Sequence, residues 1–421
     1  MKNKSARHKE ENTFKFQAFS ERLSTINIDV FHRVDHAYET ESDENISYFY
    51  QDVEKWIVLN LTEGFESFIK EIKSNLLVTL PQVILHKEHV VDTLIKYLKL
   101  KDPLYLQPLL SLTASLARDL RKEFYEYYPR FYDILFELLE TKDTEQLEWV
   151  FSCLAYFFKF LWRFLIKDIT KVFNSLLPLL SENKPEYINN FAAESFAFVA
   201  RKVKDRNSFL CLLLKTVTNK QEVIQWIIGC GKLLFEVIKG VNGQLHSCAE
   251  DILPFLFKSL SDSNLPQETL FKVLEYTIAH TVDYIDPQKS GIFWDSILEQ
   301  LDKLIEYWKN DRNASKCLEN LLKLLGQAVE HKNGKIVQDP KTIIQRIINL
   351  LNLEDLPEDV MLIVIQISVV ILLSVRIRLS QEQASLLVKN SLSVKNKNAL
   401  LYFVDNSTDF SLFEAFVLRI S

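Results

Sequence analysis

The chain has 421 residues, of which 48% are hydrophobic and 25% are charged, so it can bury a large core and is not disordered throughout. It contains only 8 glycines and 11 prolines, too few for the many turns of a strand-rich sandwich or a doubly wound fold. The net charge of −6 does not indicate a nucleic-acid coat, although local groups of cations can still contact RNA.

The first 55 residues differ from the rest of the chain. They are polar and weakly periodic, and they include the acidic stretch Glu39–Glu44. We therefore expect a partly ordered N-terminal arm over residues 1–55. A basic cluster opens this arm, and its members are Lys2, Lys4, Arg7 and Lys9. Such a cluster can contact RNA phosphates or can be a solvated tail, and the residues leave both interpretations open.

After the arm, the pattern predicts helix after helix. In Gln107–Leu120, leucines recur at steps of three and four residues, the period of a one-faced helix, and Pro103 and Pro108 are expected to mark its start. Asp143 is expected to open a further helix over Glu145–Leu161. Helix pairs are predicted at residues 106–140, 145–182, 187–219, 221–261, 266–308, 313–352 and 357–391.

The spacing of these pairs falls in the range of helical repeats, about 34–47 residues. We therefore predict an all-α fold, an armadillo-like α-solenoid of degenerate HEAT-like helix pairs over residues 56–421. The last segment, Asp409–Ser421, ends with an apolar stripe rather than the polar face of a capping repeat. The solenoid is expected to continue beyond this chain, or a partner is expected to cover this end.

One segment, Val360–Leu379, has nearly the length and hydrophobicity of a membrane span. Its apolar run is broken by Gln366, Ser368 and Ser374 and ends at Arg376. A fully buried central helix is the preferred interpretation, and no membrane partner is expected.

Two stretches bring nucleophilic residue types into view. Ser195 lies within NFAAESFAFVARKVKD, on the apolar face of an expected helix, where its hydroxyl can bond to the Phe191 carbonyl. His246, Ser247 and Cys248 are consecutive, and immediate neighbours seldom come within reach of each other for catalysis. We interpret both stretches as packing features and predict that the protein is not an enzyme.

No cofactor, metal or small-molecule substrate is expected. The nearest approaches to a phosphate-binding loop, Gly229–Gly231 and Gly240–Gly243, lack the later positions of the motif. The spaced pairs His32/His36 and His86/His89 have no third ligand nearby in the sequence. The five cysteines are odd in number and widely spaced, which favours buried thiols in a reducing compartment.

Two further groups could serve nucleic acids. A dense aromatic stripe could stack bases, but such density at helical spacing favours core packing. Its members are Trp149, Phe151, Tyr156, Phe157, Phe158, Phe160, Leu161, Trp162, Phe164 and Leu165. A second basic cluster, Arg201, Lys202, Lys204 and Arg206, could contact phosphates or complement a helix dipole.

Several segments together resemble one family. They are Glu11–Val34, Trp56–Phe68, Leu116–Phe124, Asp143–Asp168, Asn189–Asp205 and Lys239–Cys248. In order along residues 11–251, they resemble the N-terminal region of very long HEAT-repeat proteins of the small-subunit processome. This is the U-three small-nucleolar-RNA-associated protein twenty family, also called the down-regulated-in-metastasis family. Its members are several times longer than this chain, so the resemblance implies a fragment or truncated form.

The resemblance implies a scaffold in the nucleus and nucleolus. It would bind pre-ribosomal RNA, the U-three small nucleolar ribonucleoprotein and other processome proteins during small-subunit rRNA processing and ribosome biogenesis. The family has no known enzymatic residues, so none is carried over to this chain. The alternative is a karyopherin-like transport or cargo-adaptor solenoid, which would bind nuclear-pore repeats. An enzyme with a site between repeats is a third hypothesis, and replacing Ser195 or His246 would test it.

Overall fold

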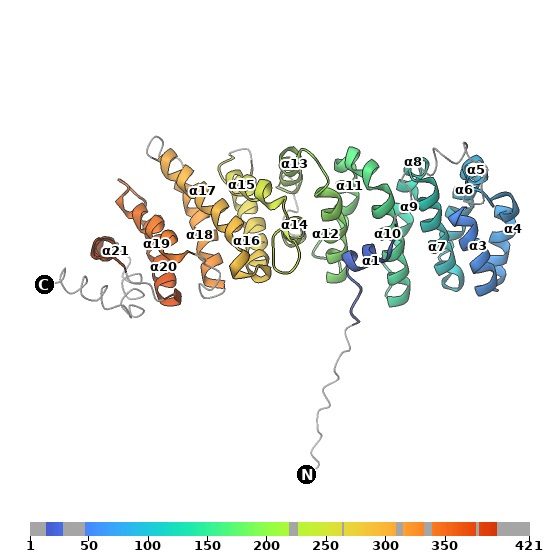
Figure 1. Cartoon of the computed structure of the whole chain (residues 1–421), viewed down its shortest axis with the longest axis horizontal. Helices are drawn as coiled ribbons and strands as arrows, with labels where there is room; N and C mark the ends of the chain where they lie inside the picture. Colours follow the sequence, from blue (N-terminus) through green and yellow to red (C-terminus); the bar gives the residue numbers. More distant parts are fainter. Residues whose placement is uncertain are drawn as a thin grey trace, which may run out of the picture. The chain divides into compact units, whose positions relative to one another are not determined.

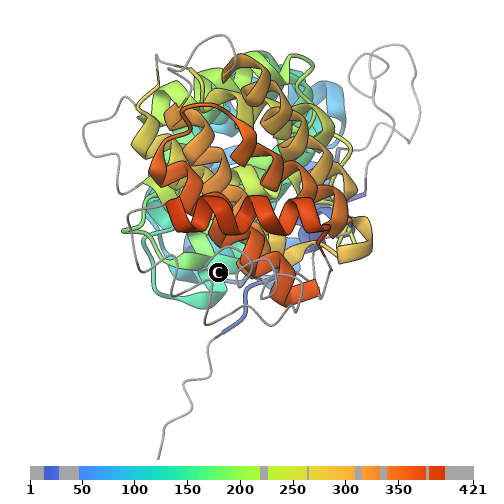
Figure 2. The same cartoon turned by 90° about the vertical axis from the view of Figure 1, so that its left-hand side faces the viewer.

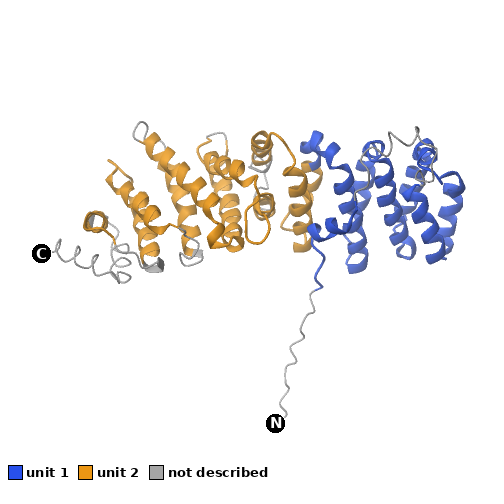
Figure 3. Cartoon of the chain, in the orientation of Figure 1, with its two compact units in different colours: residues 1–172 blue, residues 173–421 orange. Residues whose placement is uncertain are grey.

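The structure is a computed structural model, and it describes residues 14–27, 47–218, 226–262, 265–308, 315–331, 339–375 and 379–393. Within these ranges the secondary structure is α-helix with short 3-10 segments, and the only β-type pairing there is an isolated antiparallel bridge between Lys239 and Leu245. The expected all-α class is confirmed. The chain divides into two compact units, residues 1–172 and residues 173–421 (Figure 3).

Unit 1 holds the first helices of the chain, which are labelled in Figure 1. They are α1 (Phe19–Thr25), α3 (Tyr48–Leu59), α4 (Glu63–Ile72), α5 (Leu80–Leu85), α6 (Lys87–Leu98), α7 (Pro103–Leu120), α8 (Lys122–Tyr125), α9 (Tyr128–Leu138) and α10 (Thr144–Leu165). Helix α11 (Ile169–Leu176) crosses the division between the units. Helix α7 packs against both α3 and α10, and α6 contacts α4, α7 and α9. The arm boundary expected at residue 55 falls inside α3.

Helix α7 begins at Pro103, one of the two prolines expected to mark its start and four residues before the predicted Gln107, and Pro108 lies inside the helix. Asp102 caps the helix by accepting a hydrogen bond from the Leu104 backbone N–H at 2.9 Å. Because proline has no N–H, Pro108 leaves the Leu104 carbonyl without its usual partner in the helix. The Asn60 side-chain amide donates to that carbonyl at 2.8 Å, so a contact from the α3–α4 connection compensates for the lost bond.

Helix α10 starts at Thr144, one residue before the predicted Glu145, and the Asp143 side chain caps it by accepting hydrogen bonds from the Glu145 and Gln146 backbones at 2.9 and 3.2 Å. Its aromatic stripe is mainly core. Phe157, which is fully buried, lies 5.1 Å between ring centroids from Phe124. The preferred interpretation of this stripe as core packing is confirmed for its buried members, which are Phe151, Phe157, Phe158, Phe160, Leu161 and Leu165.

Unit 2 continues the pattern of paired helices. They are α12 (Glu186–Ala200), α13 (Arg206–Thr218), α14 (Ile227–Ile238), α15 (Ala249–Ser259), α16 (Gln267–Tyr284), α17 (Gly291–Trp308), α18 (Ser315–His331), α19 (Pro340–Asn349), α20 (Glu358–Val375) and α21 (Gln381–Ser393). Each predicted pair from residues 187–219 to residues 357–391 contains two of these helices. Helix α14 contacts α12 and α16, and α18 contacts α16 and α20. Helix α15 likewise contacts α13 and α17, so helices two places apart in the chain pack together.

The apolar segment that begins at Val360 forms α20, and its described core positions are buried, with Val364 and Ile365 fully inaccessible to solvent. Figure 2 faces the C-terminal helices of unit 2, where α21 contacts both α19 and α20. Within the described residues, one helical stretch, Thr144–Leu180, is long and apolar enough to cross a membrane by length and composition alone. More than half of its most apolar window is buried, as in a core helix of a soluble protein.

Candidate nucleic-acid interface

The second basic cluster lies where α12 ends and the chain turns into α13. Arg201 is the C-cap residue of α12, and Arg206 is the first residue of α13. Lys202 and Lys204 lie on the connection between them. The first basic cluster, Lys2, Lys4, Arg7 and Lys9, lies outside the described residues, as do His32, His36 and residues 409–421.

Arg201 is engaged with the end of a neighbouring helix. Its guanidinium donates to the carbonyl of Val237 at 3.1 Å, to that of Lys239 at 2.6 Å and to that of Glu236. These carbonyls lie at the C-terminal end of α14, where the last carbonyl groups have no hydrogen-bond donor within the helix and carry partial negative charge. The dipole that Arg201 complements is therefore that of α14 and not that of its own helix. This geometry gives Arg201 a structural role.

The chain after α14 folds into a small hairpin, residues 239–245. The central residues Asn242 and Gly243 have φ values of 51° and 70°, and the Gln244 N–H donates to the Val241 carbonyl at 3.0 Å. Positive φ at both central positions is the geometry of a type I′ turn, for which the pair Asn-Gly is strongly preferred. The Tyr284 hydroxyl donates to the Gly240 carbonyl at 2.7 Å and holds the hairpin against α16.

Two of the segments that carry the family resemblance therefore meet in unit 2. Asn189–Asp205 contributes Arg201. Lys239–Cys248 contributes the Lys239 carbonyl, to which Arg201 donates, and it also forms the hairpin. Their separation in sequence hides this contact, and no local pattern in either segment predicts it.

His246 and Cys248 come together after the hairpin, contrary to the expectation that residues so close in sequence do not reach each other. The residues lie in a turn, and His246 Nδ1 is 3.0 Å from the Cys248 sulfur and accepts a hydrogen bond from the Cys248 N–H at 3.2 Å. The Cys248 thiol also lies 3.2 Å from the Val237 carbonyl, to which it donates. Burial raises the pKa of the Cys248 thiol, although Arg201 and Arg206 act against this rise.

The pKa of His246 is lowered, first by burial and then by the positive charges of Arg201, Arg206 and Lys202. A neutral imidazole beside a protonated thiol is the opposite of the imidazolium–thiolate pair of cysteine hydrolases. The pair therefore does not resemble an activated nucleophile.

We expect Cys248 to resist alkylation by iodoacetamide at neutral pH. Its side chain is 1% exposed and its pKa is raised, so the reactive thiolate is scarce and inaccessible. The half-buried Cys211 serves as the comparison within the same unit. Mass spectrometry of the native chain should show labelling of Cys211 ahead of Cys248, with equal labelling after denaturation. Rapid labelling of native Cys248 would instead indicate an activated thiol.

The other three cations of the cluster remain at the surface. Arg206 Nη1 pairs with Asp251 at 2.6 Å, and its side chain is 29% exposed. The Lys202 ammonium lies 4.4 Å from the centre of the Phe198 ring. Lys204 is exposed. Together with His246, these residues form what we call the His246 patch: Lys202, Lys204, Arg206 and His246.

Ser195 lies in the core of unit 2, with no exposed surface. Its hydroxyl donates to the carbonyl of Ala192 at 3.1 Å, one residue later than the expected acceptor, Phe191. This bond within the helix satisfies the hydroxyl, so the packing interpretation of Ser195 is confirmed.

We expect Ser195→Ala to lower the melting temperature only slightly, because the lost bond is local and the Ala192 carbonyl keeps its helical partner, the Phe196 N–H, inside α12. Ser195→Phe should destabilise unit 2 by about 1–3 kcal/mol, because the site is fully packed. Thermal melts of both variants and the wild-type chain provide the measurement. A phenylalanine variant that melts with the wild type would contradict the buried placement.

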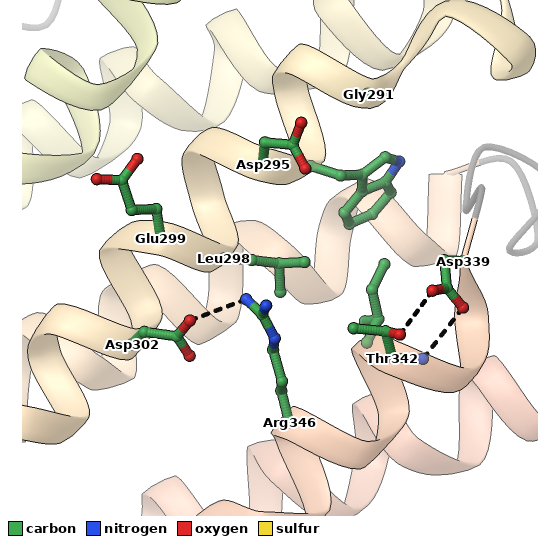
Figure 4. A pocket seen from close by; sticks show the side chains of 10 residues that line it. Gly291, Asp295, Leu298, Glu299, Asp302, Asp339, Thr342 and Arg346 are labelled. Carbon is green, nitrogen blue, oxygen red and sulfur yellow. Dashed lines mark hydrogen bonds and ion pairs between the residues drawn. The ribbon is translucent and has the colours of Figure 1, made fainter.

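A hollow with a volume of about 370 Å³ lies between α17 and α19 (Figure 4). Carboxylates dominate the charged groups along it, namely Asp295, Glu299, Asp302 and Asp339, together with Arg346. Asp302 pairs with Arg346 at 2.9 Å, Asp339 caps the start of α19, and Glu299 forms an ion pair one turn along α17. Three of these carboxylates thus have structural partners, and the hollow gives no basis for a ligand site.

The described residues contain no group of three or more histidine, cysteine, aspartate or glutamate side chains placed to hold a metal ion. Of the histidine pair His86/His89, the His89 ring binds the Glu71 carbonyl at 2.9 Å and so serves helix packing.

The fold and the patch together define an all-α protein that presents a local group of cations on a chain of net negative charge. No family model matches the chain. It is 29% identical over 282 residues to the "U3 small nucleolar RNA-associated protein 20" of Schizosaccharomyces pombe, a match that covers 66% of this chain and 11% of that protein. The Saccharomyces cerevisiae protein of the same name is 28% identical over 268 residues, which cover 62% of this chain and 11% of that protein.

The resemblance to the U3 small nucleolar RNA-associated protein 20 family is thereby confirmed, and the matched part spans 11% of the length of these relatives. Among solved structures, the crystal structure of an engineered protein covers 88% of this chain at 15% identity with a TM-score of 0.27. An overlap this low supports no conclusion about the fold.

Proposed function

We propose that the chain is part of a nucleolar scaffold of the small-subunit processome that acts in small-subunit rRNA processing and ribosome biogenesis. The observation that carries the proposal is the similarity to two yeast proteins named for association with the U3 small nucleolar RNA. The whole proteins are much longer than the matched part, so their activities are transferred to this chain only as a proposal.

In this proposal the helix pairs stack as HEAT-like repeats. Support comes from unit 2, where α14 contacts α12 and α16 while α15 contacts α13 and α17. Each pair then buries one stripe against the next and leaves a surface for partners. Pre-ribosomal RNA, the U3 ribonucleoprotein and other assembly factors would bind through many modest contacts whose effects combine. No residue has a catalytic role in this scheme.

Sedimentation of the tagged protein tests the proposal. The protein should enter the fractions of large precursor-RNA particles in nucleolar extracts at moderate salt, and it should recover the U3 small nucleolar RNA upon affinity purification. RNase treatment before sedimentation is the control for particle association. The proposal fails if the protein stays in the light fractions or if the U3 RNA is not enriched. Binding to nuclear-pore repeats in its place would favour the transport-adaptor alternative.

A further inference from the structure

We propose that the His246 patch binds the phosphodiester backbone of single-stranded RNA, with Arg206, His246 and Lys204 as the contacting residues. This site deepens the proposed function, on which it rests, because it assigns RNA binding to one place in unit 2. Arg201 is not part of the contact surface, since its guanidinium is bonded to the carbonyls at the end of α14.

Arg206 keeps part of its side chain at the surface. Its Nη1 donates to Asp251 at 2.6 Å, and the side chain is 29% exposed. The guanidinium fork also suits the oxygens of a phosphate group.

His246 presents a second donor next to these cations. Its Nδ1 accepts the Cys248 N–H at 3.2 Å, so the proton of the neutral ring lies on Nε2. None of the described residues forms a hydrogen bond with Nε2. The charges of Arg201, Lys202 and Arg206 all lower the pKa of His246, which places the ring within a region of positive potential. A neutral donor in such a region can bind an anionic oxygen.

Lys204 extends the positive region into solvent. It is exposed, and its Cα lies within about 8 Å of that of Arg206, because two peptide units of 3.8 Å separate them. Arg206 is the arginine of the patch, and it already forms an ion pair with Asp251. A phosphomonoester carries about −1.5 to −2 charges and is best bound by several arginines that are not paired with carboxylates. The singly charged phosphodiester of RNA therefore fits this patch better than a phosphorylated side chain.

Salt-dependent RNA binding by the full chain tests the site. Fluorescence anisotropy with a short labelled single-stranded RNA would be measured between about 50 and 200 mM salt. Lys204→Ala combined with Arg206→Gln should weaken binding about tenfold. It should also make the slope of log K against log salt shallower by about 1.4, because each lost contact with single-stranded RNA contributes about 0.7. The matched control is Lys215→Ala combined with Lys258→Gln, which removes two exposed cations elsewhere in unit 2.

His246→Leu tests whether the neutral imidazole contributes to RNA affinity as a hydrogen-bond donor and not as a charge. Affinity should fall about fivefold while the salt slope stays unchanged, and His246→Gln, which keeps an N–H donor, should recover part of the loss. Circular dichroism of each variant controls for folding. The proposal is overturned if the Lys204/Arg206 variant matches the Lys215/Lys258 control in affinity and slope. It is also overturned if a phosphoserine peptide binds the patch while RNA does not. If the Lys204/Arg206 variant binds RNA more weakly as expected but the wild-type protein does not co-sediment with precursor-RNA particles, only the proposed function is rejected.

Discussion

Arg201→Met is expected to loosen the end of α14 and the hairpin that follows it, at a cost of about 3 kcal/mol in local stability. Hydrogen bonds to charged groups contribute about 1.5–3 kcal/mol each, and the substitution leaves the carbonyls of Glu236 and Lys239 without their donor. The Val237 carbonyl keeps one partner, the Cys248 thiol, so the loss is smaller than three full bonds. Methionine retains most of the packed volume, which isolates the effect of the lost donors.

Hydrogen exchange detected by mass spectrometry provides the measurement, because a chain of this size need not unfold in a single step. Amides of residues 227–248 should exchange faster in the variant, whereas amides of α18 and α20 should be unaffected. Arg201→Lys is the control that keeps the charge. The single ammonium group of lysine cannot reproduce a planar guanidinium that donates to three carbonyls. Amides of residues 227–248 should therefore show intermediate protection from exchange in the lysine variant. Unchanged exchange across residues 227–248 in the methionine variant would show that Arg201 does not support this region.

The helices of this protein could be predicted because the signals that define them are local. Leucine spacing located α7, and Asp143 located the start of α10 to within one residue, because a capping side chain binds only the turn that follows it. The helix pairs of unit 2 were likewise visible in the sequence. A clear error in locating a helix was Pro108, which lies inside α7 and not at its start. The bond that permits this comes from Asn60, which is distant in the sequence and invisible to a local rule.

The sequence identified the cationic residues of the candidate site, but it did not predict how they are placed relative to one another. Charge clustering drew attention to Arg201, Lys202, Lys204 and Arg206 as a set. The structure separates Arg201 from the others, because the free carbonyls at the end of α14 come within its reach. His246 was considered only as a catalytic residue, and its place beside the cations depends on the hairpin. The Asn-Gly pair at residues 242–243 was the one signal in the sequence that could have indicated this hairpin.

Gly229 shows how a motif argument can miss a packing function. Gly229 was noted for its likeness to a phosphate loop, but it lies within α14 where the helix touches the backbone at the end of the 3-10 turn Leu177–Leu180. A Cβ atom at Gly229 would lie 1.9 Å from the Leu180 carbonyl oxygen. Glycine is therefore required at this position by close approach of backbone and not by ligand chemistry.

Gly229→Ala is accordingly expected to destabilise unit 2 by about 2 kcal/mol or more. The clash with backbone should cost about 3 kcal/mol or more, and the higher helix propensity of alanine offsets about 1 kcal/mol of it. Gly326→Ala in α18 is the matched control, because the added Cβ would lie 3.2 Å from Cγ1 of Ile367, a side-chain atom that can shift. That variant should stay within about 0.5 kcal/mol of the wild type in chemical denaturation, since propensity and crowding nearly cancel. If both variants unfold alike, the close approach of α14 to Leu180 is not what demands a glycine at residue 229.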